Sequence, residues 1–183
     1  MKMQFKAQLN KWVGLTALLA LTACSSTQIS KAPSWTGLDK LALVPLSNYT
    51  ETPGAALGAQ SIAQSLLHQK GFTQLATYPF SDSAGTYLLN NTDQQRAQAL
   101  DWARQTGARY ALTGAVQEWR YKVGIDGEPV VGLSFDVVDL DTGAVVWSAM
   151  GSRSGWSRST LAGVGHDLIS QLLAPIHPRA PTS

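Results

Sequence analysis

The sequence predicts a single α/β domain in which helices pack on a mixed sheet of about five strands. Apolar runs of strand length alternate with amphipathic helical patterns over the first half of the domain. Residues 117–156 then contain three extended runs separated by two turns rich in Asp and Gly, which is typical of an antiparallel meander. A last helical pattern follows it. The order β-α-β-α-β-β-β-α therefore predicts an α/β sandwich whose C-terminal strands form the meander.

The N-terminus has the build of a lipoprotein signal peptide. Three lysines precede an uncharged run over residues 12–20, and the tetrapeptide Leu-Thr-Ala-Cys ends at Cys24. The apolar run is too short to span a bilayer as a helix. The tetrapeptide resembles the lipobox of bacterial lipoproteins, in which the cysteine is acylated and begins the mature chain. Because Cys24 is the only cysteine, no intramolecular disulfide competes for this thiol.

We expect the mature chain to be lipid-anchored to the outer membrane and to face the periplasm. Ser25, and not an aspartate, follows the acylated cysteine, which by the lipoprotein sorting rule directs the protein to the outer membrane. The expected organisation is a signal peptide over 1–23, an acylated cysteine and short tether over 24–34, an α/β domain over 35–176 and a tail over 177–183. Without the signal peptide, 11 Lys and Arg stand against 12 Asp and Glu, a net charge of −1. This balance does not suggest nucleic-acid binding.

The first part of the mature chain predicts a tether, a strand and a helix. Residues 25–33 are small and polar, which indicates a tether. The continuous apolar run over 40–46 is typical of a strand buried on both faces. After a loop over 47–54, the apolar residues of 55–69 fall on one stripe of a helix, and Gly71 is placed to end it.

The middle of the domain predicts a second strand and a second helix. Residues 72–76 can form a short strand, and 78–91 is polar and irregular. Asp93 is a suitable N-cap for a helix over 94–106. A strand over 108–116 then leads into the meander.

The meander carries the candidate functional residues. The turn between its first two strands projects Asp126 and Glu128, although Asp-Gly is also ordinary turn chemistry. Strand alternation places Trp147 in the core. Trp156 has small or charged neighbours, so we expect it to be exposed to a partner or a membrane. The final helix is predicted over 160–173 and ends before prolines.

The sequence offers no catalytic or metal constellation. The three histidines lack metal-ligand spacing, and the Gly-rich turn over 54–58 lacks the Walker lysine. Hydroxyl residues 157–160 are better explained by an N-cap. Asp136 and Asp139 are an odd number of residues apart on a strand, so they point to opposite faces and do not form a glycosidase acid/base pair. We therefore expect no enzyme activity, no metal and no cofactor.

Three motifs carry a family resemblance: EWRYKVGIDGEPVVGLSF over 118–135, DTGAVVWSAMGSRSGWSR over 141–158, and LVPLSNYTETPGA over 43–55. Together with the lipobox they resemble the PelC family, outer-membrane lipoproteins of Pel exopolysaccharide secretion. The strand-first layout is also similar to the N-terminal domain of TolB, to LpoB and to the periplasmic part of CsgG. Fold alone therefore does not fix the function.

The resemblance implies a homo-oligomeric ring, a dodecamer, that surrounds the periplasmic end of an outer-membrane β-barrel porin and guides a partly cationic amino-sugar polymer. It implies that Asp126 belongs to an electronegative surface that attracts the polymer, and Glu128 joins this surface because it lies beside Asp126. It implies that Trp156 belongs to an aromatic belt at the membrane. We expect this belt on the other rim of the ring, on the same side as the acylated Cys24.

Two other function classes fit the sequence less well. An LpoB-like lipoprotein that activates a peptidoglycan synthase needs a long spacer, yet only about ten residues, at ~3.3 Å each, separate Cys24 from Trp35. A periplasmic glycan hydrolase needs a spaced carboxylate pair, which the sequence does not offer. Whether Trp35 packs on the domain or sits at the membrane interface is open from sequence.

Overall fold

Seven strands form one mixed sheet in the computed structural model of the chain, which describes residues 25–31, 40–79, 93–124 and 127–178. Along the chain the elements are β1 (Ser25–Ile29), β2 (Leu41–Leu43), β3 (Ser47–Asn48), α2 (Ala55–Gln69), β4 (Ala76–Thr77), α4 (Asp93–Gln105), β5 (Tyr110–Tyr121), β6 (Pro129–Asp139), β7 (Val145–Ser154) and α5 (Leu161–Leu172). The predicted residues Cys24, Trp35 and Asp126 lie outside the described residues, as does most of the segment 78–91.

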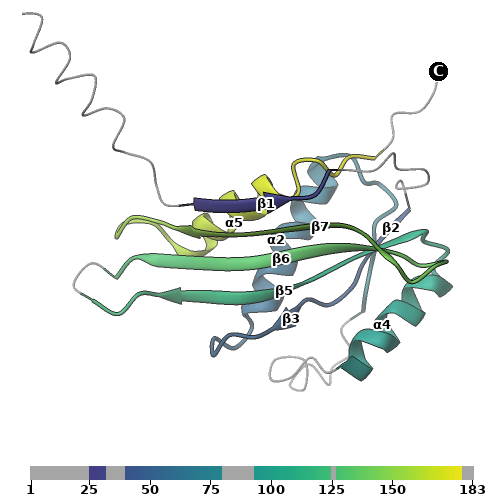
Figure 1. The fold of residues 1–183 in the computed structure, drawn as a ribbon, viewed down its shortest axis with the longest axis horizontal. Helices are drawn as coiled ribbons and strands as arrows, with labels where there is room; N and C mark the ends of the chain where they lie inside the picture. The colour runs from purple at the N-terminus through teal and green to yellow at the C-terminus, as the bar shows by residue number, and fades with distance from the viewer. Residues whose placement is uncertain (1–24, 32–39, 80–92, 125–126, 179–183) are drawn as a thin grey trace, which may run out of the picture.

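The sheet has the order β1-β7-β6-β5-β2-β4, and β3 pairs with β5 off this path (Figure 1). Strands β2 and β3 run parallel to β5, and β4 runs parallel to β2. Strands β5, β6, β7 and β1 are antiparallel neighbours. The predicted α/β class with a mixed sheet and a C-terminal antiparallel meander is therefore confirmed, with seven strands where about five were expected.

Strand β1 is the main departure from the expected layout. Residues 25–33 were expected to be a tether, but Ser25 to Ile29 pair with β7, and Ser25 lies opposite Arg153. The pairing continues past the strand, because the Ser30 N–H donates to the Ser148 carbonyl at 2.9 Å. The Trp147 indole N–H also donates to the Ser30 carbonyl at 3.2 Å. An edge strand needs only backbone hydrogen bonds on one side, so a polar sequence can supply it.

The predicted strand over 72–76 is shorter and lies later than expected. Only Ala76–Thr77 pairs with β2, whereas the preceding residues complete the turn that ends α2. Gly71 has a φ of 95°, the left-handed conformation expected at a helix end. The Phe72 N–H then donates to the Leu67 carbonyl at 3.1 Å, and its ring is fully buried. Phe72 is a core residue that follows the helix and does not begin a strand.

The main core lies between the sheet and two helices. Helix α5 packs on β6 and β7, and α2 packs on α5 and β5. Alternate residues of β6 point into this layer, and all four are buried: Val131, Leu133, Phe135 and Val137. Trp147 is 2% exposed, which confirms its predicted place in the core.

A smaller core lies on the opposite face, where α4 packs. Ala42 and Val44 of the β2 segment face this side together with Ala111, and they contact Ala99 and Ala103 of the helix. Helix α4 lies apart from α2 and α5 in Figure 1. The apolar residues of the run over 40–46 lie partly in one core and partly in the other. This strand is therefore buried on both faces, as the sequence indicated.

The rest of that face carries mainly polar side chains, with the exposed Met150 among them. The polar ones come from β1, β6 and β7 and line two shallow hollows: Ser26, Gln28, Ser134, Asp136, Ser148 and Ser152. They alternate along the strands with residues that face the main core. We call this surface the open face.

Candidate functional site

The β5–β6 hairpin carries the predicted acidic tip. Tyr121 pairs with Pro129, and the Lys122 N–H donates to the Glu128 carbonyl at 2.8 Å, so the two strands stay bonded close to the turn. Gly127 has a φ of 49°, which explains the glycine at this turn. The hairpin holds Glu128 beside Lys122 on the opposite strand.

Glu128 is not a free negative charge. The Lys122 ammonium lies 3.0 Å from the Glu128 carboxylate, and both side chains are about two-fifths exposed. Farther along β5, Arg120 pairs with Glu118 at 2.7 Å. Glu118 and Glu128, the two described acidic residues nearest the tip, are thus ion-paired. The expected electronegative surface therefore depends on Asp126, which lies outside the described residues.

Trp156 is exposed, as the sequence predicted. Its side chain is 62% exposed, although it follows directly after the end of β7. A tight turn fixes its backbone, since its N–H donates to Ser159 Oγ at 3.2 Å and its carbonyl accepts the Ser159 N–H at 2.8 Å. Thr160 then caps α5 by accepting the Gly163 N–H. The indole is presented outward by an ordered backbone.

The glycine before Trp156 is needed for close packing. A Cβ on Gly155 would lie 2.5 Å from a methyl carbon of Val164 and 2.8 Å from the Cβ of Ser159. The Gly155 N–H also donates to the Pro129 carbonyl at 2.8 Å. The segment before the exposed indole is therefore held against the base of the β5–β6 hairpin.

The start of β1, the end of β7 and the base of the β5–β6 hairpin lie at one end of the sheet (Figure 1). Ser25, which follows Cys24 directly, lies opposite Arg153, and Val130 lies opposite Ser154. The sequence-based expectation placed the acidic tip and the Trp156 belt on different rims of a ring. In one protomer the hairpin base and the segment before Trp156 are hydrogen-bonded neighbours. Because Asp126 at the tip lies outside the described residues, the expected placement on two rims stays a prediction.

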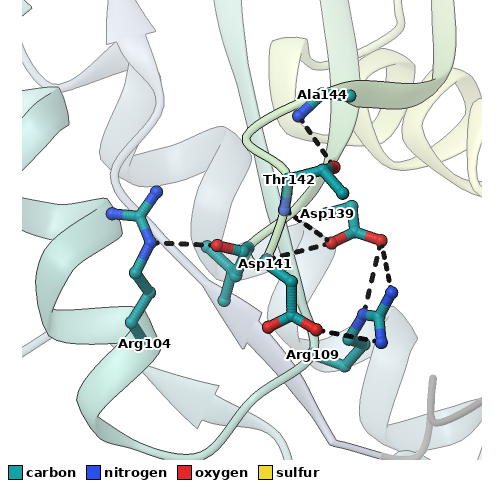
Figure 2. A network of polar contacts seen from close by, with 7 residues as sticks. Arg104, Arg109, Asp139, Asp141, Thr142 and Ala144 are labelled. Atoms are coloured by element: carbon teal, nitrogen blue, oxygen red, sulfur yellow. Dashed lines mark hydrogen bonds and ion pairs between the residues drawn. The ribbon is translucent and has the colours of Figure 1, made fainter.

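The turn between β6 and β7, at the other end of these strands, holds a separate charged network (Figure 2). One carboxylate oxygen of Asp139 accepts the N–H groups of Asp141 and Thr142 at 2.9 and 3.2 Å. The other oxygen accepts the Arg109 guanidinium at 2.8 Å. Arg104 of α4 donates to the Leu140 carbonyl at 3.0 Å. This network fixes the turn and ties it to α4.

The same contacts lower the pKa of the Asp139 carboxyl. The hydrogen bond from Arg109 is the main cause, the turn N–H groups reinforce it, and burial opposes it. Arg109 in turn has its pKa raised, chiefly by the same bond. Asp136 lies on the open face, where it accepts a hydrogen bond from the Ser148 hydroxyl. Asp136 and Asp139 have separate partners, in line with the argument that they are not an acid/base pair.

A hollow beside β5 was not predicted from the sequence. It has a volume of 580 Å³ and is lined by loop residues 49–52 and strand residues 117–120. Tyr49, at its margin, is 71% exposed. The loop belongs to the LVPLSNYTETPGA motif, which the sequence analysis had singled out. Its contact with β5 could not be predicted, because it depends on how the chain folds.

No group of three or more His, Cys, Asp or Glu side chains among the described residues could hold a metal ion. No helix in this part of the chain is long and apolar enough to cross a membrane.

Comparisons with known proteins give a clear family. No protein-family model matches the chain, and no curated protein sequence matches it. Two solved structures of the PelC dodecamer from Paraburkholderia phytofirmans match it. One is of a point variant, at 44% identity and a TM-score of 0.72, and covers 85% of this chain and 100% of that chain. The other matches at 43% identity and a TM-score of 0.71, over 86% and 100%.

A more distant match shows the fold alone. Lipoprotein GNA1162 from Neisseria meningitidis shares 18% identity at a TM-score of 0.53, over 74% of this chain and 95% of that chain. The PelC structures, in contrast, combine high identity with complete coverage of the relative. This chain therefore belongs to the PelC family.

Proposed function

We propose that this protein is a non-catalytic outer-membrane lipoprotein of Pel export that assembles into a periplasmic ring. The ring guides a partly cationic exopolysaccharide to an outer-membrane β-barrel porin. Its PelC relative from P. phytofirmans is a dodecamer, which supports a ring here. The observation that carries the proposal is that Ser25, the Trp156 segment and the β5–β6 hairpin lie at one end of the sheet.

In this proposal, one end of each protomer meets the membrane. Acyl chains on Cys24 would anchor the chain directly beside β1, and each buried methylene contributes about 0.8 kcal/mol. Trp156 lies near the same end with its indole exposed, and an indole is suited to the interface between lipid headgroups and water. Repeated around a ring, the indoles form a belt that seats the assembly on the bilayer.

Polymer guidance in this proposal comes from charge repeated by symmetry. A single hairpin offers Asp126 and an ion-paired Glu128, which is a weak site. A ring repeats the hairpin once per protomer, and a collar of like charges produces a continuous negative field. Such a field retains a cationic chain without gripping any one sugar.

The test combines imaging with export. The mature lipoprotein, purified in detergent, is imaged by negative stain, and extracellular polymer is measured in cells whose own copy is deleted and replaced by a variant. We expect rings for the wild type, and for Asp126→Ala we expect intact rings with reduced export. Trp156→Ala should weaken outer-membrane association or export. Val145→Ala, which shortens another exposed apolar side chain at the far end of β7, is the matched control and should change neither.

Three results would each contradict a part of the proposal. If negative stain showed only particles the size of single protomers, the proposed ring would be contradicted. Normal export by a well-expressed Asp126→Ala variant would remove the negative collar from the mechanism, and undisturbed fractionation and export of Trp156→Ala would remove the aromatic belt.

A further inference from the structure

The hollow beside β5 is a polar site next to the hairpin. One wall is the loop between β3 and α2, residues 49–52, and the other wall is residues 117–120 of β5. The same stretch of β5 continues directly into Lys122 and the hairpin tip. A chain molecule that lies along this edge of β5 would therefore meet the hollow and the tip in succession.

Hydrogen bonds hold the loop in one conformation. The Tyr49 N–H donates to the Val116 carbonyl at 2.9 Å, which fixes the start of the loop to β5 at the end of the β3–β5 pairing. Asn48 accepts from the Thr50 hydroxyl at 2.8 Å and donates to the Thr52 carbonyl at 3.0 Å. The Thr52 hydroxyl donates to the Trp119 carbonyl at 2.6 Å. The loop is thus fixed both internally and to β5 before any ligand arrives.

This fixed loop exposes an aromatic ring and a carboxylate. Tyr49 is 71% exposed, although its neighbour Leu46 is buried in the core. Glu51 is exposed as well, and no described side chain forms an ion pair with it. A loop backbone fixed in this way presents the Tyr49 ring and the Glu51 carboxylate beside the hollow, so binding a ligand there does not have to order the loop first.

The opposite wall supplies hydrogen-bonding groups. Gln117 is exposed and donates to Ser134 Oγ at 3.1 Å, which leaves its carbonyl oxygen as an acceptor. Glu118 and Arg120 form their ion pair at the same wall. The site therefore combines one aromatic face with carboxylates, an amide and a guanidinium. These are the groups that bind the apolar face, the hydroxyls and the ammonium of an amino sugar.

We propose that this hollow binds one amino-sugar residue of the exported polymer, with the ring of Tyr49 packed on the sugar and the carboxylate of Glu51 paired with its ammonium. The proposal rests on the proposed function, because it takes the polymer of that function as its ligand. It deepens that function by adding a contact site, outside the acidic tip, at which an individual sugar is held.

Binding is measured on the full mature lipoprotein in detergent, by calorimetric titration with a glucosamine hexamer and with an N-acetylglucosamine hexamer. We expect Tyr49→Ala to weaken binding of both oligomers about fivefold, because both lose the packing of a sugar's apolar face on an aromatic ring. Tyr49→Phe should bind like the wild type. Glu51→Gln should weaken binding of the glucosamine hexamer alone, because only this oligomer carries ammonium groups.

Two controls match the variants in chemistry. Tyr121→Ala removes a second exposed tyrosine, which lies on β5 and does not line the hollow. Asp167→Asn removes an exposed carboxylate on α5. Both should leave the affinity for either hexamer unchanged. Equal effects of Tyr121→Ala and Tyr49→Ala would mean that aromatic loss in general, and not this hollow, weakens binding, and would overturn the proposal.

Two further outcomes overturn it. One is that Tyr49→Ala and Glu51→Gln bind both hexamers like the wild type. The other is that Tyr49→Ala breaks the oligomer, seen by mass photometry, with no change in affinity, because the hollow would then be a contact between protomers. Neither outcome touches the proposed function, whose failure is read separately from ring images and from export by Asp126→Ala.

Discussion

Ser25 lies opposite Arg153 in the β1–β7 pairing, so the residue after Cys24 is already part of the sheet. Trp156 follows Arg153 by three residues in the chain. Acyl chains on Cys24 would therefore be held close to the exposed indole, and the protomer would have a defined orientation on the membrane. The short distance between anchor and sheet is a property that can be changed without touching the core.

A spacer between Cys24 and Ser25 should separate anchoring from orientation. Insertion of Ser-Gly-Ser-Gly-Ser-Gly keeps a serine after the cysteine and adds a reach of about 20 Å. We expect unchanged acylation and unchanged unfolding, but reduced polymer export, because the sheet is no longer held at the bilayer. Metabolic labelling with a fatty acid, thermal unfolding and extracellular polymer are the three measurements. Export at the wild-type level would show that the short anchor has no role.

Trp147 should be the most important single side chain for β1. It is 2% exposed, and its indole N–H donates to the Ser30 carbonyl just past β1. Trp147→Ala should lower the free energy of unfolding by about 3–5 kcal/mol. Trp147→Phe, which keeps a buried ring but loses the hydrogen bond, should cost less than the alanine variant. Urea unfolding measures both.

The exposed Trp156 is the internal control for that measurement. Trp156→Ala should change the free energy of unfolding by no more than about 0.5 kcal/mol, because a surface side chain contributes little to stability. If Trp147→Ala lowered the free energy of unfolding as little as Trp156→Ala does, the hydrogen-bonded attachment of β1 to the core would be contradicted.

Asp139 should make stability depend on acid pH. Arg109 holds the pKa of its carboxyl below the ordinary value of about 3.9. The stability that this pairing contributes is present above the unfolded-state pKa and is lost as the pH falls through the lower folded-state pKa. Asp139→Asn should therefore lower the melting temperature at pH 7 and flatten its decline below about pH 4. Thermal unfolding across this range measures both effects.

Asp101→Asn is the matched control for Asp139. Asp101 also pairs with an arginine, Arg104 at 2.6 Å, but its side chain is 68% exposed and water screens the pair. Its substitution should lower the melting temperature at pH 7 by less than Asp139→Asn does. It should also leave the decline of the melting temperature below about pH 4 unchanged. If the melting temperature of Asp139→Asn declined below about pH 4 as steeply as that of the wild type, this carboxylate would not be the cause of the decline.

The elements with local signals were predictable. Helix α2 runs over Ala55–Gln69 as predicted, because an apolar stripe and Gly71 mark it within one stretch of sequence. The meander was predictable from its turns for the same reason. Strand β1 was not, because its sequence is polar and its partner strand lies more than 100 residues later.

The candidate site divides in the same way. The neighbours of Trp156 are small or charged and show no regular spacing of apolar residues, so the sequence predicted that Trp156 is exposed. The structure confirms this exposure. The hollow at Tyr49 depends on where the β3–α2 loop meets β5, which no local pattern encodes. The Lys122–Glu128 pair had a usable signal, since the two residues flank the turn symmetrically and face each other across the hairpin.

That pair provides the sharpest test of guidance by charge. Asp126→Asn removes one negative charge from each hairpin and should reduce export. Lys122→Gln removes the partner of Glu128, which lies 3.0 Å away, and so restores the net charge of the hairpin. If a summed field retains the polymer, the double variant should export better than Asp126→Asn alone, because the field depends on net charge and not on the position of one carboxylate. The rescue should also weaken as ionic strength rises, since exposed charges are screened over about 8 Å at 0.15 M salt. A double variant that exports no better than Asp126→Asn would show that the polymer needs a specific contact at Asp126, and the collar would be replaced by a discrete binding site.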